Sequence, residues 1–219
     1  MTTRPDPAPI PRFDRVERAA HWTTAVLFGA LMATGAVLYA GPFSMLFGRR
    51  ELFRQIHVYA GLLLPVPVLI GVAGRWGAQL RRDVGRINRW TRDDARWFRR
   101  RNRVRPGRVE VGKFNAGQKL NATFFAAAVV VMLATGLILR WPNPFSNDWR
   151  TGATFVHDWF AFGIWIAVLG HVFFAIRDPI ALHGMTSGSV TPHWARTERP
   201  AWYREMTGDR RDQSAVGKE

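Results

Sequence analysis

The sequence predicts an all-α fold, an integral membrane four-helix bundle with both termini in the cytoplasm and an additional helix on the cytoplasmic surface. Three observations support this prediction. Four long stretches of the 219 residues are apolar and nearly uncharged. The 31 Lys and Arg residues are concentrated between alternate stretches, and four of the six His residues lie within the stretches or at their ends.

Each apolar stretch is close to the roughly 20 residues that an α-helix needs to cross about 30 Å of hydrocarbon. Pro65 and Pro67 predict a kink in the second stretch, because proline removes a helix hydrogen bond. The first stretch lies too far from the N-terminus, and lacks the small-residue cleavage pattern, to be a removed signal peptide. We predict spans at residues 22–43, 55–75, 119–140 and 154–177.

Lys and Arg are distributed unevenly between the connections. The N-terminal segment carries 4 of them, the connection 75–119 carries 15 and the tail from Arg177 carries 7, whereas the other two connections share 5. Four spans put the three basic segments on one side, which the positive-inside rule places in the cytoplasm. Nucleic-acid binding competes as an explanation of the net charge of +15, but the Arg run lies between two spans. We expect a multi-pass protein of the bacterial cytoplasmic (inner) membrane that contacts the lipid bilayer and no nucleic acid.

Residues 88–101 place Trp90, Trp97 and Phe98 among Arg residues at helical spacing. This pattern predicts a helix lying on the anionic inner leaflet. The sequence has no Cys, which excludes disulfides, covalently attached c-type haem, Cys-ligated iron–sulfur clusters and thiolate zinc sites. Any metal must therefore bind to His or to oxygen ligands.

His157 and His171 are 14 residues apart in the fourth span. That is almost four helical turns, so the two side chains share one face about 21 Å apart along the axis. The residues between them on this face are apolar, as on a helix that contacts haem or on an ordinary packed helix: Phe160, Ala161, Ile164 and Val168.

The depths of the histidines predict two pairs. His57 and His157 belong at the outer surface, and His21 and His171 towards the inner one. Two bis-imidazole sites, each bridging two helices, are what two non-covalent haem b groups stacked across a bilayer require. Iron with both axial positions filled by imidazole nitrogen has no open position for oxygen or substrate. Such a haem can therefore relay electrons and little else. An alternative is a transporter or scaffold whose histidines bind metal ions or protons, although no carboxylate or Lys lies deep in the spans.

Three other features of the sequence are candidates for a structural or functional role. Arg18, one turn before His21, is a candidate partner for a haem propionate or a positive-inside anchor. His183 and His193 are interpreted as surface residues of the polar tail. Residues 32–35 (MATG) and 133–136 (LATG) end the first and third spans with similar sequences, which indicates either two related hairpins or the small residues common in membrane packing.

Three strings resemble the cytochrome b (gamma) subunit of respiratory formate dehydrogenase, within the broader di-haem cytochrome b family that also serves nickel–iron hydrogenases. They are residues 13–22 (FDRVERAAHW), residues 113–119 (KFNAGQK), and the C-terminal Gly184-Met185 with residues 202–205 (WYRE). The resemblance implies a di-haem cytochrome b transmembrane domain at 1–180 and a polar cytoplasmic tail at 181–219. It also implies the same four haem ligands: His21, His57, His157 and His171.

The resemblance further implies a quinone, menaquinone or ubiquinone, beside the inner haem near His171 and residues Asn115, Ala116 and Gly117. Asn115 is also a candidate N-cap of the third span. The implied partners are an iron–sulfur subunit and a molybdenum or tungsten catalytic subunit at the outer side. On this interpretation the chain is not catalytic on formate and carries the site of quinone reduction. The alternative is the cytochrome b subunit of another respiratory dehydrogenase, such as a nickel–iron hydrogenase.

Overall fold

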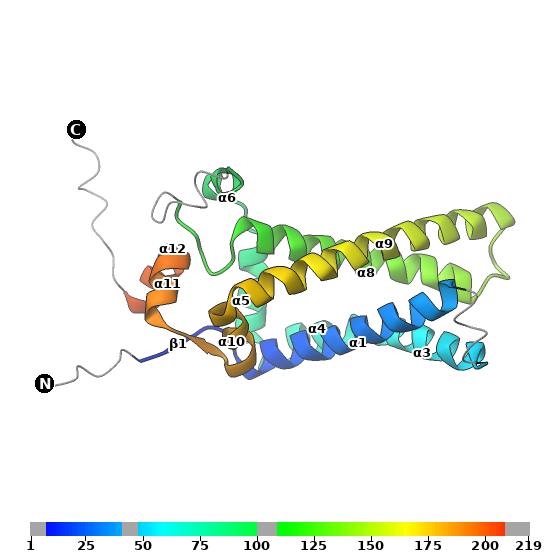
Figure 1. The fold of residues 1–219 in the computed structure, drawn as a ribbon, viewed down its shortest axis with the longest axis horizontal. Helices are drawn as coiled ribbons and strands as arrows, with labels where there is room; N and C mark the ends of the chain where they lie inside the picture. The colour runs from blue at the N-terminus through cyan, green and yellow to red at the C-terminus, as the bar shows by residue number, and fades with distance from the viewer. Residues whose placement is uncertain (1–7, 41–47, 100–108, 209–219) are drawn as a thin grey trace, which may run out of the picture.

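The computed structural model describes residues 8–40, 48–99 and 109–208. Four long helical segments run side by side as an elongated bundle (Figure 1), and each is long and apolar enough to cross a membrane. They are α1 (Arg15–Tyr39), α3 (Arg50–Leu63) with α4 (Val66–Ala73), α8 (Ala116–Arg140) and α9 (Asn147–Arg177). The predicted all-α four-helix membrane architecture is confirmed.

Several of the helices begin earlier than the apolar stretches do, and at α1 the reason is a polar cap. Asp14 accepts a hydrogen bond from the Glu17 amide, and the Glu17 carboxylate accepts one from the Asp14 amide, both at 2.8 Å. This capping box starts α1 at Arg15 rather than at residue 22. The helix α9 starts after Ser146, seven residues before the predicted 154. The predicted end of the first span at 41–43 lies outside the described residues.

The second span is interrupted where its prolines predict a kink. The helix α3 ends at Leu63 and α4 begins at Val66. The amide of Leu64 donates to the Gly61 carbonyl at 3.3 Å, and helical bonding resumes with Leu69 donating to Pro65 at 3.0 Å. The missing proline amide therefore divides the span into two helices.

The connection after α4 contains α5 (Ala78–Asn88) and α6 (Arg92–Trp97). The single helix predicted over 88–101 was wrong in its bounds, since Asn88 ends α5 and α6 has six residues. Thr91 explains the break. Its hydroxyl accepts from the Asp94 amide and the Asp94 carboxylate accepts from the Thr91 amide, so a new helix starts there. Residues 100 and 101 lie outside the described part of the chain.

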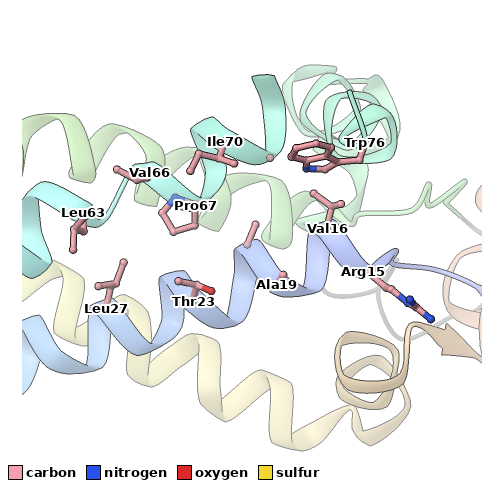
Figure 2. Close-up of a pocket in the computed structure, with 12 residues that line it drawn as sticks. Arg15, Val16, Ala19, Thr23, Leu27, Leu63, Val66, Pro67, Ile70 and Trp76 are labelled. Atoms are coloured by element: carbon pink, nitrogen blue, oxygen red, sulfur yellow. The ribbon is translucent and has the colours of Figure 1, made fainter. Parts of the chain in front are cut away.

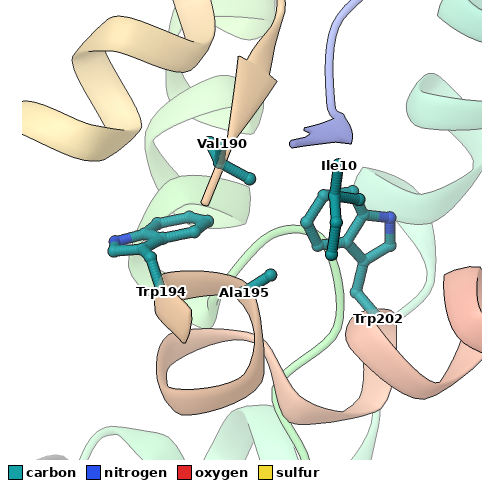
Figure 3. Packing of buried hydrophobic residues seen from close by; sticks show 5 residues of the cluster. All are labelled: Ile10, Val190, Trp194, Ala195 and Trp202. Carbon is teal, nitrogen blue, oxygen red and sulfur yellow. The ribbon is translucent and has the colours of Figure 1, made fainter. Parts of the chain in front are cut away.

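The segment predicted as a polar tail is folded as far as Thr207. It comprises α10 (Pro179–Ser187), β2 (Ser189–Val190), α11 (Pro192–Glu198) and α12 (Pro200–Thr207), and β2 pairs antiparallel with β1 (Ile10–Pro11). These elements bury a small hydrophobic core, shown in Figure 3: Ile10, Val190, Trp194, Ala195 and Trp202. The exposed His183 and His193 lie outside it, as expected for surface residues.

A left-handed turn at Gly188 joins this segment to the start of the chain. Gly188 has φ +98°, and its carbonyl accepts hydrogen bonds from the amides of Arg12 (2.7 Å) and Phe13 (3.0 Å). A Cβ atom here would lie 2.8 Å from the Phe13 carbonyl oxygen. Glycine is therefore required by both the backbone conformation and the space.

Figure 1 shows β1, α5, α6, α10, α11 and α12 at the same end of the bundle. The N-terminal segment, the central connection and the C-terminal segment are therefore neighbours, as expected if they share one side of a membrane. We call this the basic end of the bundle. That it faces the cytoplasm stays a prediction from the charge distribution.

Candidate functional site

Two histidine rings from different helices face each other at the end of the bundle opposite the basic end. His57 lies in α3 and His157 in α9, and their ring centroids are 6.4 Å apart with an angle of 62° between the ring planes. Each ring is also contacted by a threonine, since Thr34 Oγ1 lies 2.9 Å from His57 Nδ1 and Thr135 Oγ1 lies 2.9 Å from His157 Nδ1. The structure thus brings together the pair that the sequence assigned to the outer surface.

A second pair of rings lies towards the basic end. His21 of α1 and His171 of α9 have centroids 6.1 Å apart and ring planes at 57°. The Trp22 indole packs edge-on against the His21 ring at 5.4 Å, and its Nε1 donates to the Met185 carbonyl at 3.2 Å. The inner pair is therefore connected to α10 through Trp22.

The two pairs are well separated along α9. Fourteen residues of helix place His157 and His171 about 21 Å apart. Between them Ile164 is buried, whereas Phe162 and Ile166 on other faces are exposed. Phe160, Ala161 and Val168 are half-buried. The predicted apolar stripe therefore does face the bundle interior.

The spacing of the rings fits a metal ion held between two imidazoles. With about 2 Å for a metal–imidazole bond and about 1 Å from that nitrogen to the ring centre, two axial imidazoles have centroids roughly 6 Å apart. Within the described residues no three or more His, Asp or Glu side chains gather as ligands for a metal ion. Two ligands are fewer than the four of a tetrahedral zinc site. They suit a haem, whose porphyrin supplies four nitrogens and leaves two axial positions.

A buried ion cluster holds the basic end together. The Lys113 ammonium is fully buried and lies 3.4 Å from the Glu17 carboxylate of α1; it also forms an ion pair with Asp83 of α5. Asp83 in turn accepts from Arg86 at 2.7 Å. Because Glu17 and Asp83 belong to two different helices, Lys113 links α1, α5 and the chain entering α8. A second buried pair, Lys119 with Asp94 at 2.8 Å, links α8 to α6.

This cluster was not predicted from the sequence, although the composition offers a clue. Only three of the 31 cationic residues are lysines, and two of them are Lys113 and Lys119. A lysine ammonium is a compact point charge with three donors, which suits contact with more than one oxygen acceptor. Arg18, considered as a propionate partner, donates to the carbonyls of Asp14 and Thr186.

Asn115, Ala116 and Gly117 form the start of α8. The Asn115 Oδ1 accepts from the Gln118 amide at 2.9 Å, and Gln118 Oε1 accepts from the Asn115 amide at 3.1 Å. This capping box uses the Asn115 side-chain oxygen and not its NH₂ group. Ala116 is buried, and a Cβ at Gly117 would lie 3.0 Å from the Trp97 ring. The predicted N-cap is confirmed, and Gly117 permits the close approach of α6.

Phe114, beside Asn115, packs near Phe13, with ring centroids 6.2 Å apart. The strings 13–22 and 113–119, far apart in the sequence, are therefore neighbours at the basic end. The inner histidine His21 belongs to the first string. Asn115, Ala116 and Gly117 thus lie at the same end of the bundle as the inner pair.

A groove of about 530 Å³ lies between α1 and α4. Thr23, Pro67 and Trp76 are among its lining residues (Figure 2). None of the four histidines lines it. On α1 the lining positions Ala19 and Thr23 are each two residues from His21, about 200° around the helix. The groove is therefore separate from the histidine pairs.

Comparison with known proteins identifies the family of this chain. A family model described as prokaryotic cytochrome b561 matches residues 12–188, a range that contains all four histidines. This chain belongs to the prokaryotic cytochrome b561 family. The matched range begins and ends at Arg12 and Gly188, the residues whose hydrogen bond joins the N-terminal segment to the C-terminal one.

Several relatives are similar over most of this cytochrome. The formate dehydrogenase cytochrome b556 subunit of Haemophilus influenzae is 27% identical over 199 residues, which cover 86% of this chain and 79% of the relative. The formate dehydrogenase cytochrome b556(fdo) subunit of Escherichia coli K12 is 28% identical over 207 residues, covering 90% and 93%. The nitrate-inducible cytochrome b556(Fdn) subunit of the same organism is 27% identical over 203 residues, covering 87% and 88%. Membership of this cytochrome b family implies haem b, and the four apolar helices indicate a multi-pass membrane protein.

Proposed function

We propose that this cytochrome is the membrane subunit of a formate dehydrogenase and relays electrons from an iron–sulfur subunit to a quinone. The names of the relatives and their coverage of most of the chain support the formate dehydrogenase assignment. The single observation that carries the relay is the presence of two histidine ring pairs, 6.4 Å and 6.1 Å between centroids, at two depths in one bundle.

Two haem b groups are assigned to these pairs, the outer one to His57 and His157 and the inner one to His21 and His171. Bound haem with two imidazole ligands supplies reversible one-electron transfer and leaves no axial position for a substrate. The protein's part is to hold each pair of rings across two helices. The helix α9 contributes one ligand to each site, so its length sets their separation.

The quinone, menaquinone or ubiquinone, is assigned to the basic end beside the inner pair, near Asn115, Ala116 and Gly117. The Asn115 NH₂ group, which the capping box does not use, is a suitable donor to a quinone carbonyl, and the Trp97 ring lies beside Gly117. Reduction of the quinone occurs on this subunit, which does not act on formate itself. We place the protein in the bacterial inner membrane with both termini cytoplasmic.

The partners are assigned to the opposite end, where an iron–sulfur subunit and a molybdenum or tungsten catalytic subunit would deliver electrons near the outer pair. Co-purification from native membranes with peptide identification tests this directly. Formate dehydrogenase subunits are expected in the complex. Hydrogenase subunits in their place would assign the cytochrome to the alternative dehydrogenase. The proposed haem sites would be unaffected by that result.

Haem content of purified variants tests the sites. The wild-type protein should show a b-type α band in its reduced-minus-oxidised spectrum and two haems per chain. His57→Ala and His171→Ala should each remove one haem, because the pairs are about 21 Å apart and share no ligand. His193→Ala, at an exposed position of α11, is the matched control and should keep both. Absence of a b-type band in the wild type, or one haem per wild-type chain, would contradict the proposal.

A further inference from the structure

The repeated sequence Ala-Thr-Gly of the first and third spans acquires a role in the structure. Thr34 of α1 contacts His57 of α3, and Thr135 of α8 contacts His157 of α9, each with 2.9 Å between Oγ1 and Nδ1. In both cases the threonine lies on a different helix from the histidine. The two hairpins therefore repeat the same contact around the outer pair.

The glycine after each threonine lies beside the same histidine ring. A Cβ at Gly35 would lie 3.4 Å from His57 Cε1, and one at Gly136 would lie 3.6 Å from His157 Cε1. Each histidine ring thus rests against the backbone of the neighbouring helix beside the hydroxyl. Thr34 and Thr135 are themselves buried, with 5% and 8% of their surface exposed.

The direction of each hydrogen bond follows from a second contact of the hydroxyl. Thr34 Oγ1 lies 2.6 Å from the Ala30 carbonyl oxygen, and Thr135 Oγ1 lies 2.8 Å from that of Val131. A carbonyl oxygen only accepts, so the single hydroxyl hydrogen of each threonine is donated to it. The threonine oxygen must then accept from the histidine, which fixes the proton on Nδ1.

A proton on Nδ1 leaves the lone pair on Nε2, the nitrogen available to a metal. A hydrogen bond from the other ring nitrogen also makes a ligating imidazole more basic, and a more basic ligand favours the ferric over the ferrous ion. Within the described ranges, by contrast, neither His21 nor His171 has a side chain or backbone group hydrogen-bonded to its ring. The two pairs therefore differ in their surroundings.

We propose that Thr34 and Thr135 are positioning residues of the outer haem site, which orient the Nε2 atoms of His57 and His157 and lower the midpoint potential of the outer haem. This proposal rests on the proposed haem sites. The two hydroxyl groups, with the Leu31 backbone as a further hydrogen-bond partner of His57, make the outer site electronically distinct from the inner one.

Redox titration of the haem-loaded protein purified from membranes tests the proposal. The His57→Ala variant identifies which titration step belongs to the outer haem. Thr34→Val and Thr135→Val, which keep the side-chain shape and remove the hydroxyl, should each shift the outer step to higher potential, with the largest shift in the double variant. The inner step should not move, and Thr34→Ser should restore the wild-type value.

Thr24→Val is the matched control, because the Thr24 hydroxyl of α1 is buried without a hydrogen-bond partner in the described structure. It should leave the outer step unchanged. Loss of the outer haem in Thr34→Val but not in Thr34→Ser also supports positioning by the hydroxyl.

Two haems with wild-type potentials in the double valine variant would overturn the proposal, as would equal effects of Val and Ser. A wild-type protein without b-type haem would instead overturn the proposed function.

Discussion

Replacing Lys113 by Met should lower the free energy of unfolding by about 3–5 kcal/mol, the cost of removing one partner from a buried ion pair. The Lys113 side chain is fully buried, and those of its partners Glu17 and Asp83 are 4% and 3% exposed. Methionine has a similar length but no charge, so the variant would leave the buried Glu17 side chain without its ammonium partner and Asp83 with Arg86 as its remaining cation. This loss corresponds to roughly two to three and a half powers of ten in the unfolding equilibrium.

The change is measured by titrating detergent-solubilised protein with SDS and following helix content by circular dichroism. Arg54→Met is the matched control, because Arg54 and Glu51 form an ion pair whose side chains are 51% and 60% exposed, and such pairs contribute little. Combining Lys113→Met with Glu17→Gln and Asp83→Asn should recover much of the loss, since neutral groups are less costly to bury. A Lys113→Met protein as stable as Arg54→Met would refute this account of the basic end.

Two further predictions concern the turn and the membrane orientation. Gly188→Ala should destabilise the protein by about 1–2 kcal/mol, the cost of a left-handed conformation for a residue with a Cβ. An SDS titration in which the variant unfolds like the wild type would contradict the requirement for glycine at this turn. The absence of Cys allows single-cysteine labelling with a membrane-impermeant maleimide. Ser146→Cys should react in intact spheroplasts, and His193→Cys only after the membrane is opened; the reverse pattern would contradict the predicted orientation.

The sequence was sufficient to predict the spans and the pairing of the histidines because both depend on regular periodicities. Hydrophobic length defines a membrane helix, and 3.6 residues per turn places His157 and His171 on one face. The pairing with His21 and His57 followed from the direction of each span. These inferences need no knowledge of how individual side chains pack.

The folded C-terminal segment was missed for the opposite reason. Its helices are short, and α10, α11 and α12 each begin with a proline, so no long apolar stretch marks them. Trp194 and Trp202 are buried in a cluster that includes Ile10, which is far away in the sequence. The break between α5 and α6 was more accessible, since Thr91 and Asp94 have the spacing of a capping box.

The two histidine pairs lie towards opposite ends of the bundle, and different groups contact their rings at each end. At the outer pair the supporting groups are threonine hydroxyls within the bundle. At the inner pair, Trp22 beside His21 donates to Met185, and Arg18 donates to Thr186, so α10 holds the start of α1. The folded C-terminal segment therefore belongs structurally to the inner site, and its disruption should affect that site before the outer one.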